Sequence, residues 1–278
     1  MHVAALYLYP VKSLRGFSTS QVTADRFGLE GDRRFLVVDA QSHRFLTQRA
    51  LPQMARVATA LTESTLVLHA EDGRSIELPL HGSDGPRFAV TIWNDSVTAA
   101  DCGDDAAEFL TRTLSHACRL VRVGPDFQRP VRNQTGNAAP RELCEHEVGF
   151  ADAYPILVAS ESSLADLNDR LVARGEDPVP MDRFRPNIVI AGCPAFAEDT
   201  WPRFRIGELI LQSTGPCSRC PVVTTDQSTG VRGKEPLTTL ALYRRDPNEP
   251  THVNFGQNVL NESKSGICRL GDSVVLLQ

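Results

Sequence analysis

Two thiols and a guanidinium lie within four residues of each other in the segment Cys217-Ser218-Arg219-Cys220. A Cys-x-x-Cys pair is compatible with a redox dithiol, half of a zinc site, two structural cysteines, or one thiolate that binds a soft metal. A thioredoxin-like dithiol opens a helix, whereas Pro221 and the β-branched residues after it do not resemble a helix start. The pattern therefore favours one metal-binding thiolate, whose pKa Arg219 would lower.

The other interpretations of the two cysteines stay open. Free cysteine is often buried, so both thiols could be structural. A zinc site needs two more ligands, and no second paired spacing exists among the candidates, which are Cys144, His146, Cys193 and Cys268. In the same loop, Asp226 is either a proton relay or a residue that forms a turn.

Two basic clusters lie near the N-terminus, where predicted strands begin or end. Lys12 and Ser13 follow one strand, and Arg33 precedes the apolar run Phe35–Val38. An amine, a hydroxyl and a guanidinium suit a phosphate, which accepts charge-assisted hydrogen bonds. Taken alone, the first cluster is more typical of a solvated strand end, and Arg33 of a surface ion pair with a neighbour such as Asp32 or Glu30.

A third polar cluster precedes the apolar run 188–190. Arg185 stands before Pro186, so we expect an extended backbone at Arg185. Asn187 alternates with apolar neighbours and is expected to share a face with Arg185. The pair predicts either a pocket lining or a satisfied structural asparagine.

Composition restricts the class of protein. The chain has 278 residues, a net charge of −5 and seven cysteines. The acidic balance argues against nucleic acid and acidic membranes as partners. Because the odd, irregularly spaced cysteines favour reduced thiols, we expect a cytoplasmic protein. The apolar run Val3–Leu8 is too short for a signal or membrane segment.

Many short strands and few helices predict a mainly β (α+β) fold with β-barrel-like architecture. We expect three helices, at Asp104–Leu114, Ser160–Arg174 and Pro236–Arg245, and a hairpin at Asp72-Gly73. A connector at 124–140 places the domain boundary between an N-terminal β-barrel domain, 1–123, and a C-terminal domain, 124–278.

Taken in order, the motifs resemble MOSC-domain proteins of the molybdenum cofactor class, in particular the mitochondrial amidoxime-reducing components and the bacterial MOSC iron–sulfur proteins. The segments that carry the resemblance are Tyr-Pro-Val-Lys-Ser at 9–13, Gly-Asp-Arg at 31–33, Ser-Glu-Ser-Ser-Leu-Ala-Asp-Leu-Asn at 160–168, Phe-Arg-Pro-Asn-Ile-Val-Ile at 184–190, Cys-Ser-Arg-Cys at 217–220, Lys-Glu-Pro-Leu at 234–237 and Asn-Phe-Gly-Gln-Asn at 254–258. The resemblance covers nearly the whole chain.

The resemblance implies two barrel domains and a set of site residues. Cys220 would be the protein thiolate on molybdenum, with Cys217 a bystander. The residues implied to bind the cofactor's phosphate and pterin, or to lie beside the metal, are Lys12, Ser13, Arg33, Ser160, Ser162, Arg185, Asn187, Ser218 and Arg219.

The implied activity is reduction of N-hydroxylated compounds such as amidoximes, hydroxylamines and N-hydroxylated bases. The Cys-x4-Cys-x2-Cys spacing of a ferredoxin-like domain is missing from this sequence. Electrons would therefore come from a separate donor of the ferredoxin, flavin or haem reductase type. Two alternatives remain: a sulfur or cofactor carrier that uses Cys220 as a persulfide, and a zinc-stabilised binding module.

Overall fold

Strands from both ends and the middle of the chain pair into one eight-stranded sheet in the computed structural model, which describes residues 1–81, 85–131 and 146–277. The strands in spatial order are β18 (Val274–Leu276), β14 (Arg203–Ile206), β15 (Leu209–Ser218), β16 (Asn254–Asn261), β12 (Ile156–Ser160), β13 (Ile188–Ala191), β1 (His2–Leu8) and β2 (Phe17–Thr19). A smaller sheet lies beside it, in the order β17 (Ile267–Arg269), β3 (Gln21–Asp25) and β4 (Gly28–Leu29).

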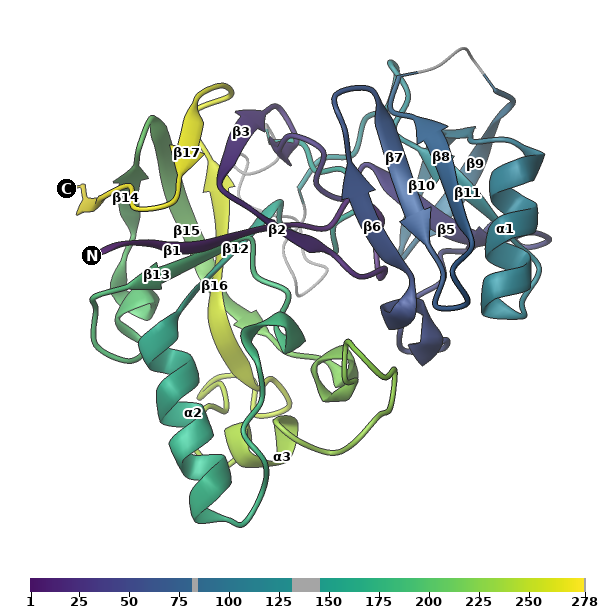
Figure 1. Ribbon diagram of the computed structural model, residues 1–278. Helices are drawn as coiled ribbons and strands as arrows, with labels where there is room; N and C mark the ends of the chain where they lie inside the picture. Colours follow the sequence, from purple (N-terminus) through teal and green to yellow (C-terminus); the bar gives the residue numbers. More distant parts are fainter. Residues whose placement is uncertain (82–84, 132–145, 278) are drawn as a thin grey trace.

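Strands β12 and β13 are parallel and are joined through helix α2 (Glu161–Ala173). A parallel pair needs such a crossover, and its strands are apolar on both faces, as the fully buried β12 is. The Ser160 hydroxyl accepts a hydrogen bond from the backbone N–H of Ser163 and so caps the helix. Figure 1 shows α2 below this sheet, with α3 (Leu237–Leu240) close to it.

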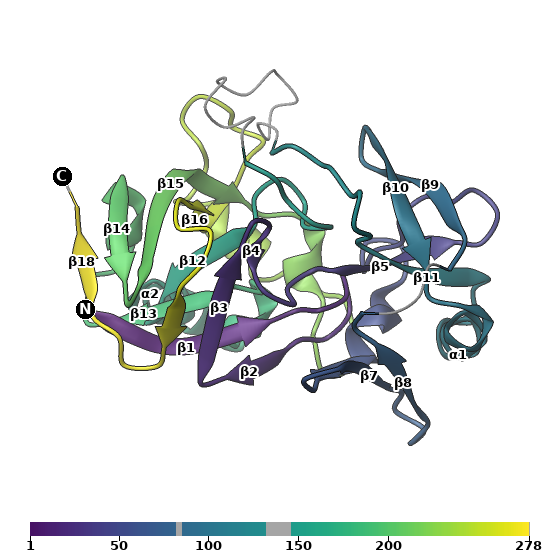
Figure 2. The same ribbon diagram turned by 90° about the horizontal axis from the view of Figure 1, so that it is seen from above.

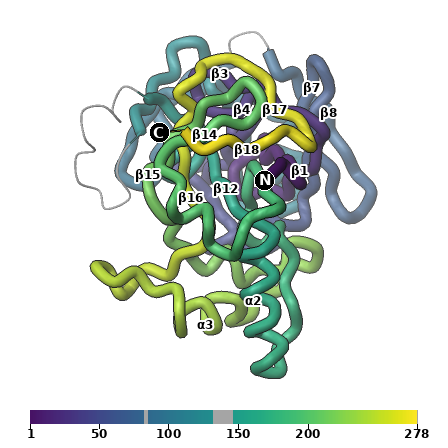
Figure 3. The backbone as a smooth tube through the Cα atoms, turned by 90° about the vertical axis from the view of Figure 1, so that its left-hand side faces the viewer, coloured from purple at the N-terminus to yellow at the C-terminus, as the bar shows by residue number. Residues whose placement is uncertain are grey.

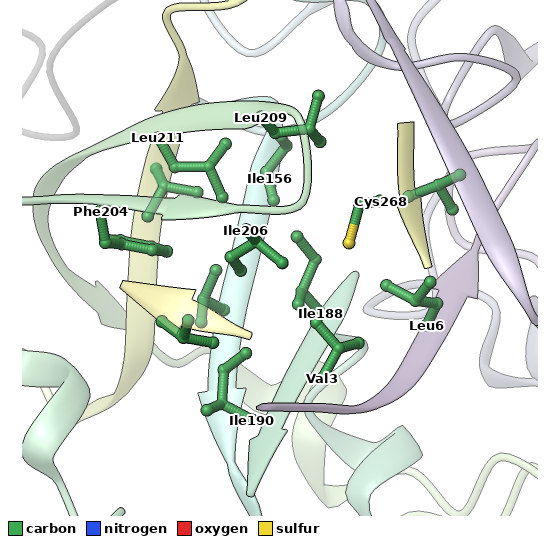
Figure 4. Packing of buried hydrophobic residues seen from close by; sticks show 14 of the residues in the cluster. Val3, Leu6, Ile156, Ile188, Ile190, Phe204, Ile206, Leu209, Leu211 and Cys268 are labelled. Carbon is green, nitrogen blue, oxygen red and sulfur yellow. The ribbon is translucent and has the colours of Figure 1, made fainter. Parts of the chain in front are cut away.

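The core of this lobe lies between the large sheet and the β3–β17 pair. Phe204 and Ile206 point inward while the alternate arginines of β14 stay outside the core. Cys268 packs against the same cluster as Leu6 (Figure 4). Burial of each large aliphatic side chain contributes roughly 1.5–3 kcal/mol, so this cluster holds the sheet together.

The second lobe contains two further sheets and one helix (Figures 1 and 2). One sheet has the order β5 (Phe35–Asp39), β11 (Cys118–Arg122), β10 (Asp95–Asp101) and β9 (Arg87–Ile92), and the other consists of β6 (Ala58–Leu61), β7 (Thr65–His69) and β8 (Ser75–Pro79). Helix α1 (Asp104–Leu114) packs its Leu110 face into this lobe's core. Short 3-10 turns span Pro52–Arg56, Met181–Arg183, Ala197–Thr200 and Pro221–Thr224.

The predicted mainly β class is confirmed, although none of the sheets closes into a barrel within the described residues. Helix α1 has the predicted bounds, and α2 lies inside its predicted range. The third helix was predicted too long. After Leu240 the chain turns, and the backbone of Arg245 pairs with Val253 in an antiparallel bridge.

The two lobes do not divide the sequence into halves. Strand β1 pairs with β13, so the N-terminal strands belong to the lobe that the C-terminal half completes. Figure 3 views the molecule from the side on which β1 and β18 lie. There the backbone N–H of Val274 donates to the carbonyl of Met1. The boundary between 1–123 and 124–278 stays a prediction, and residues 132–140 of the predicted connector lie outside the described residues. Of the described helices, none has the length and apolarity to cross a membrane.

Candidate active site

A cavity of about 560 Å³ opens where loops of both lobes meet. Eight of the eleven predicted site residues line it: Lys12, Ser13, Arg33, Arg185, Asn187, Ser218, Arg219 and Cys220. Most of them stand where a strand begins or ends, and the β-strand pairing brings these ends together from distant parts of the sequence. Arg185 and Asn187 both line the cavity, although both precede β13 and do not share a strand face.

Three of these residues have a left-handed backbone. The φ angles are 67° at Ser13, 48° at Arg33 and 55° at Arg185. A non-glycine residue in this region costs roughly 1–2 kcal/mol, and such residues concentrate at functional sites. The extended backbone predicted for Arg185 is therefore wrong. Its N–H donates to the carbonyl of Asp182 at the end of a 3-10 turn, and the chain reverses there before it enters β13.

The guanidinium of Arg33 connects the polar residues on one wall of the cavity. It donates to the Oδ1 atom of Asn187 at 2.9 Å and to the carbonyl of Arg185 at 3.2 Å, and it pairs with Asp32. The Tyr9 ring lies 4.4 Å from the Arg33 guanidinium and 4.3 Å from that of Arg185. Burial lowers the pKa of Arg185 to about 10, so it stays a cation at neutral pH.

The second lobe and the loop before β12 contribute residues that sequence reasoning missed. Arg129 is 3% exposed and donates to the carbonyls of residues 149, 151 and 152. The carboxylate of Asp152 pairs with Lys12, and Arg49 lies 3.9 Å from it. Burial raises the pKa of Asp152, but the charges of Lys12 and Arg49 outweigh this and hold it below its usual range.

The cavity is strongly cationic. The basic side chains that line it are Lys12, Arg33, Arg49, Arg129, Arg185 and Arg219, whereas the lining carboxylates are Asp95 and Asp152. Six cations against two anions leave an excess of positive charge in a partly enclosed space, where low dielectric strengthens the field. Such a cavity suits an anionic ligand that accepts several charge-assisted hydrogen bonds.

The two thiols of the Cys-x-x-Cys segment have different surroundings. The Sγ atom of Cys217 accepts a hydrogen bond from Nη1 of Arg219 at 2.9 Å. Burial raises the pKa of Cys217, and the nearby Arg219 charge only partly opposes this. Cys220 lines the cavity at the start of the 3-10 turn Pro221–Thr224. Both thiols line the cavity, and Arg219 holds the Cys217 Sγ atom as a hydrogen-bond acceptor.

The protein satisfies the guanidinium of Arg219 only in part. Its Nη2 atom donates to the carbonyl of Phe184 at 2.7 Å, and its Nη1 atom donates to Cys217. The Nε atom is buried and has no partner among the described residues. An unpaired buried donor costs about 1–3 kcal/mol, so the site is organised to receive an acceptor.

Ser160 and Ser162 lie outside the cavity lining. Ser160 caps α2, and the Ser162 hydroxyl donates to the carbonyl of Cys193 at 2.6 Å. These hydrogen bonds give both serines a structural role at the start of the helix. The zinc interpretation gains no support, since no group of three or more His, Cys, Asp or Glu among the described residues could hold a metal. Its candidate ligand Cys144 lies outside the described residues.

Asp226 also lies outside the cavity lining and forms a turn. Its Oδ1 atom accepts hydrogen bonds from the backbone and hydroxyl groups of Ser228 and Thr229, and its Oδ2 atom pairs with Arg183 at 2.9 Å. The Ser228 hydroxyl, together with the Thr229 N–H, holds the pKa of Asp226 below its usual range. Asp226 thus forms a turn outside the cavity lining, which is one of the two roles considered for it, and the proton relay stays a prediction.

Replacing Asp226 by asparagine is expected to lower stability without changing the site. The free energy of unfolding should fall by about 1 kcal/mol at neutral pH, because charged acceptors bind the loop more strongly. The folded-state pKa is depressed, so this contribution is present above the unfolded pKa of about 3.9 and disappears as the pH falls below it. Urea unfolding of both proteins at neutral and acidic pH checks this; a difference that grows in acid would contradict it.

The fold and site define a mainly β protein with a cationic, thiol-lined cavity between two lobes. Comparison with known proteins gives the family. The model of the MOSC N-terminal beta barrel domain matches residues 1–117, and the model of the MOSC domain matches residues 145–275. The chain belongs to the family of MOSC-domain proteins that includes the amidoxime-reducing components.

The curated relatives align over nearly the whole chain. Mitochondrial amidoxime-reducing component 1 of Mus musculus is 36% identical and that of Homo sapiens 35%, each over 99% of this chain and 82% of the relative. Mitochondrial amidoxime reducing component 2 of Bos taurus is 34% identical over 98% of this chain and 82% of its own length. The family resemblance predicted from the motifs is confirmed.

Proposed function

We propose that the protein is a molybdenum cofactor-dependent oxidoreductase that reduces N-hydroxylated compounds with electrons from a separate donor. One observation carries the proposal: a single cavity contains Cys220 together with six basic side chains from distant parts of the sequence. The similarity to relatives named for amidoxime reduction supports the reaction type. Amidoximes, hydroxylamines and N-hydroxylated bases are the proposed substrates.

The residues present fit such a cofactor. Molybdenum is a soft metal in this context, and Cys220 offers it a thiol at the cavity. The excess of positive charge and the unpaired Nε atom of Arg219 suit a phosphate and a heterocycle with acceptor atoms. When bound, the cofactor supplies two-electron removal of oxygen from an N–O group, which with two protons yields the N–H product and water.

The protein's own residues would bind and orient the cofactor. Lys12, Arg33 and Arg185 would hold the anionic part of the cofactor, and Lys12 would exchange Asp152 for the ligand. Ser13 and Ser218 add hydroxyl groups at the cavity, and Asn187 fixes Arg33. Because Cys217 and the Phe184 carbonyl orient Arg219, its guanidinium is preorganised beside the metal ligand.

A carrier of sulfur or cofactor, with Cys220 as a persulfide, is the second candidate. A persulfide shuttle needs no phosphate-binding cations, whereas the cavity has six basic side chains. The proposed electron donor is a separate protein, either a ferredoxin or a flavin or haem reductase. The six described cysteines are free, which supports a reducing compartment such as the cytoplasm as the proposed location.

Metal content and N–O reduction together test the proposal. The protein is purified from a host that makes the molybdenum cofactor, and molybdenum is measured by elemental mass spectrometry. We expect near-stoichiometric molybdenum and turnover of an aromatic amidoxime with a chemical reductant. Molybdenum without turnover, or no metal at all, would favour the carrier. Zinc in place of molybdenum would favour the zinc-stabilised binding module. Each of these outcomes would contradict the proposed reductase.

A further inference from the structure

Trp93 is an exposed aromatic residue that the proposed cofactor site does not use. Ile92 of β9 pairs with Asp95 of β10, so Trp93 and Asn94 form the two-residue turn of this hairpin. Trp93 has φ 54° and is 41% exposed, yet it lines the same cavity as Cys220. A bulky residue at positive φ is strained, and a turn favours asparagine or glycine there. Folding alone therefore gives no reason for an indole at this position.

The indole is held firmly in spite of its exposure. Its Nε1–H donates to Oδ1 of Asp152 at 3.0 Å, and the Arg49 guanidinium stacks over the ring at 4.5 Å. The Phe45 ring contacts it at a centroid distance of 5.0 Å. Asp152 in turn pairs with Lys12, so the indole is fixed to the same network as the proposed phosphate-binding lysine. A rigid aromatic surface loses little entropy when a ligand packs on it.

The chemistry of this surface selects its ligand. The indole has a single hydrogen-bond donor, and Asp152 already accepts from it. Trp93 therefore has no donor left for a phosphate. What remains is the exposed part of the ring, over which the delocalised Arg49 guanidinium is stacked. Such a surface binds planar conjugated groups through offset stacking, which contributes beyond the buried area alone.

We propose that Trp93, supported by Arg49 and Asp152, is the specificity-determining platform that binds planar, π-conjugated N-hydroxylated substrates such as aryl amidoximes and N-hydroxylated heteroaromatic bases. The inference rests on the proposed function and names the substrate class that the second lobe selects. The hairpin of one lobe would hold the substrate's plane, while the loop of the other lobe carries Cys220.

Kinetics with paired substrates tests the platform. Trp93→Ala should raise the KM for an aryl amidoxime about tenfold, which corresponds to the stacking contribution plus lost area. The KM for a small aliphatic hydroxylamine, kcat and molybdenum content should stay unchanged. Trp93→Phe keeps a ring and should recover most of the affinity. An equal change in KM for both substrates, or a loss of molybdenum, would overturn the proposal. A raised KM for the electron donor alone would indicate a docking surface for that donor and would also overturn it.

Binding can be measured without turnover. The chain has two tryptophans, and the other, Trp201, is 3% exposed in the core of the first lobe. An aryl amidoxime should therefore quench the fluorescence of the wild type but not that of Trp93→Phe, with the holoprotein used in both cases. If the amidoxime quenched the fluorescence of the wild type but was not reduced, the proposed function would be contradicted and the platform would be supported. Equal fluorescence quenching in the wild type and in Trp93→Phe would contradict a role of Trp93 in substrate binding.

Discussion

Cys220→Ser is expected to abolish molybdenum retention. The side chain lines the cavity, and a serine hydroxyl stays protonated at neutral pH and is a hard ligand, whereas a thiolate suits a soft metal. Molybdenum measured by elemental mass spectrometry should fall to about a tenth of the wild-type content or less, and N–O reduction should fall with it. Circular dichroism and urea unfolding should show an intact fold, because Cys220 is only partly buried.

Cys217→Ser is the matched control. The Cys217 Sγ atom accepts a hydrogen bond from Arg219, and burial raises its pKa, so the structure uses this atom as a neutral acceptor. A serine oxygen accepts the same hydrogen bond. We therefore expect this variant to keep most of the molybdenum. Comparable loss in both variants would mean that two thiols are required, and would favour a dithiol or zinc site over a single metal-binding thiolate.

Local patterns in the sequence predicted the residues that stand at strand ends. Lys12, Arg33 and Asn187 each adjoin an apolar run, and strand pairing brings such ends together. The mainly β class and two of the three helices follow from the same short-range rules. Pairing across the sheet, by contrast, is nonlocal, and no pattern predicted that β1 would join the C-terminal strands.

The missed residues have no local signature. Arg49 and Trp93 belong to loops of the second lobe, and only the meeting of the two lobes brings them to the cavity. Arg129 lies in a segment that reads as a connector, yet its guanidinium is buried. Asp152 can be recognised as a site residue only from its ion pair with Lys12 in the folded protein. Residues of this kind could be found only once the tertiary contacts were known.

One local rule was overridden by its surroundings, and one motif was ambiguous between two roles. The residue before a proline favours an extended backbone, but at Arg185 the preceding 3-10 turn and the start of β13 impose positive φ. Ser160 belongs to a specific motif, and its hydroxyl is used by the backbone of Ser163. A helix cap and a ligand contact call for the same residue type, so sequence alone does not separate them.

The strain at Arg185 leads to the second large prediction. Arg185→Ala should weaken cofactor retention by about 1.5–3 kcal/mol, the usual contribution of a hydrogen bond to a charged group. That range corresponds to roughly a 10- to 150-fold rise in the dissociation constant. Molybdenum remaining after extended dialysis measures the effect. Arg183→Ala is the control, because Arg183 pairs with Asp226 and does not line the cavity.

Arg185→Gly separates the lost cation from the strained backbone. Glycine adopts φ near 55° at no steric cost, so this variant should unfold at a urea concentration at least as high as that of Arg185→Ala. If the guanidinium binds the cofactor, both variants lose molybdenum equally although their stabilities differ. If glycine restored retention, the loss in alanine would come from the backbone. Unchanged molybdenum in both variants would remove Arg185 from the binding site, and the left-handed turn before β13 would then serve the fold alone.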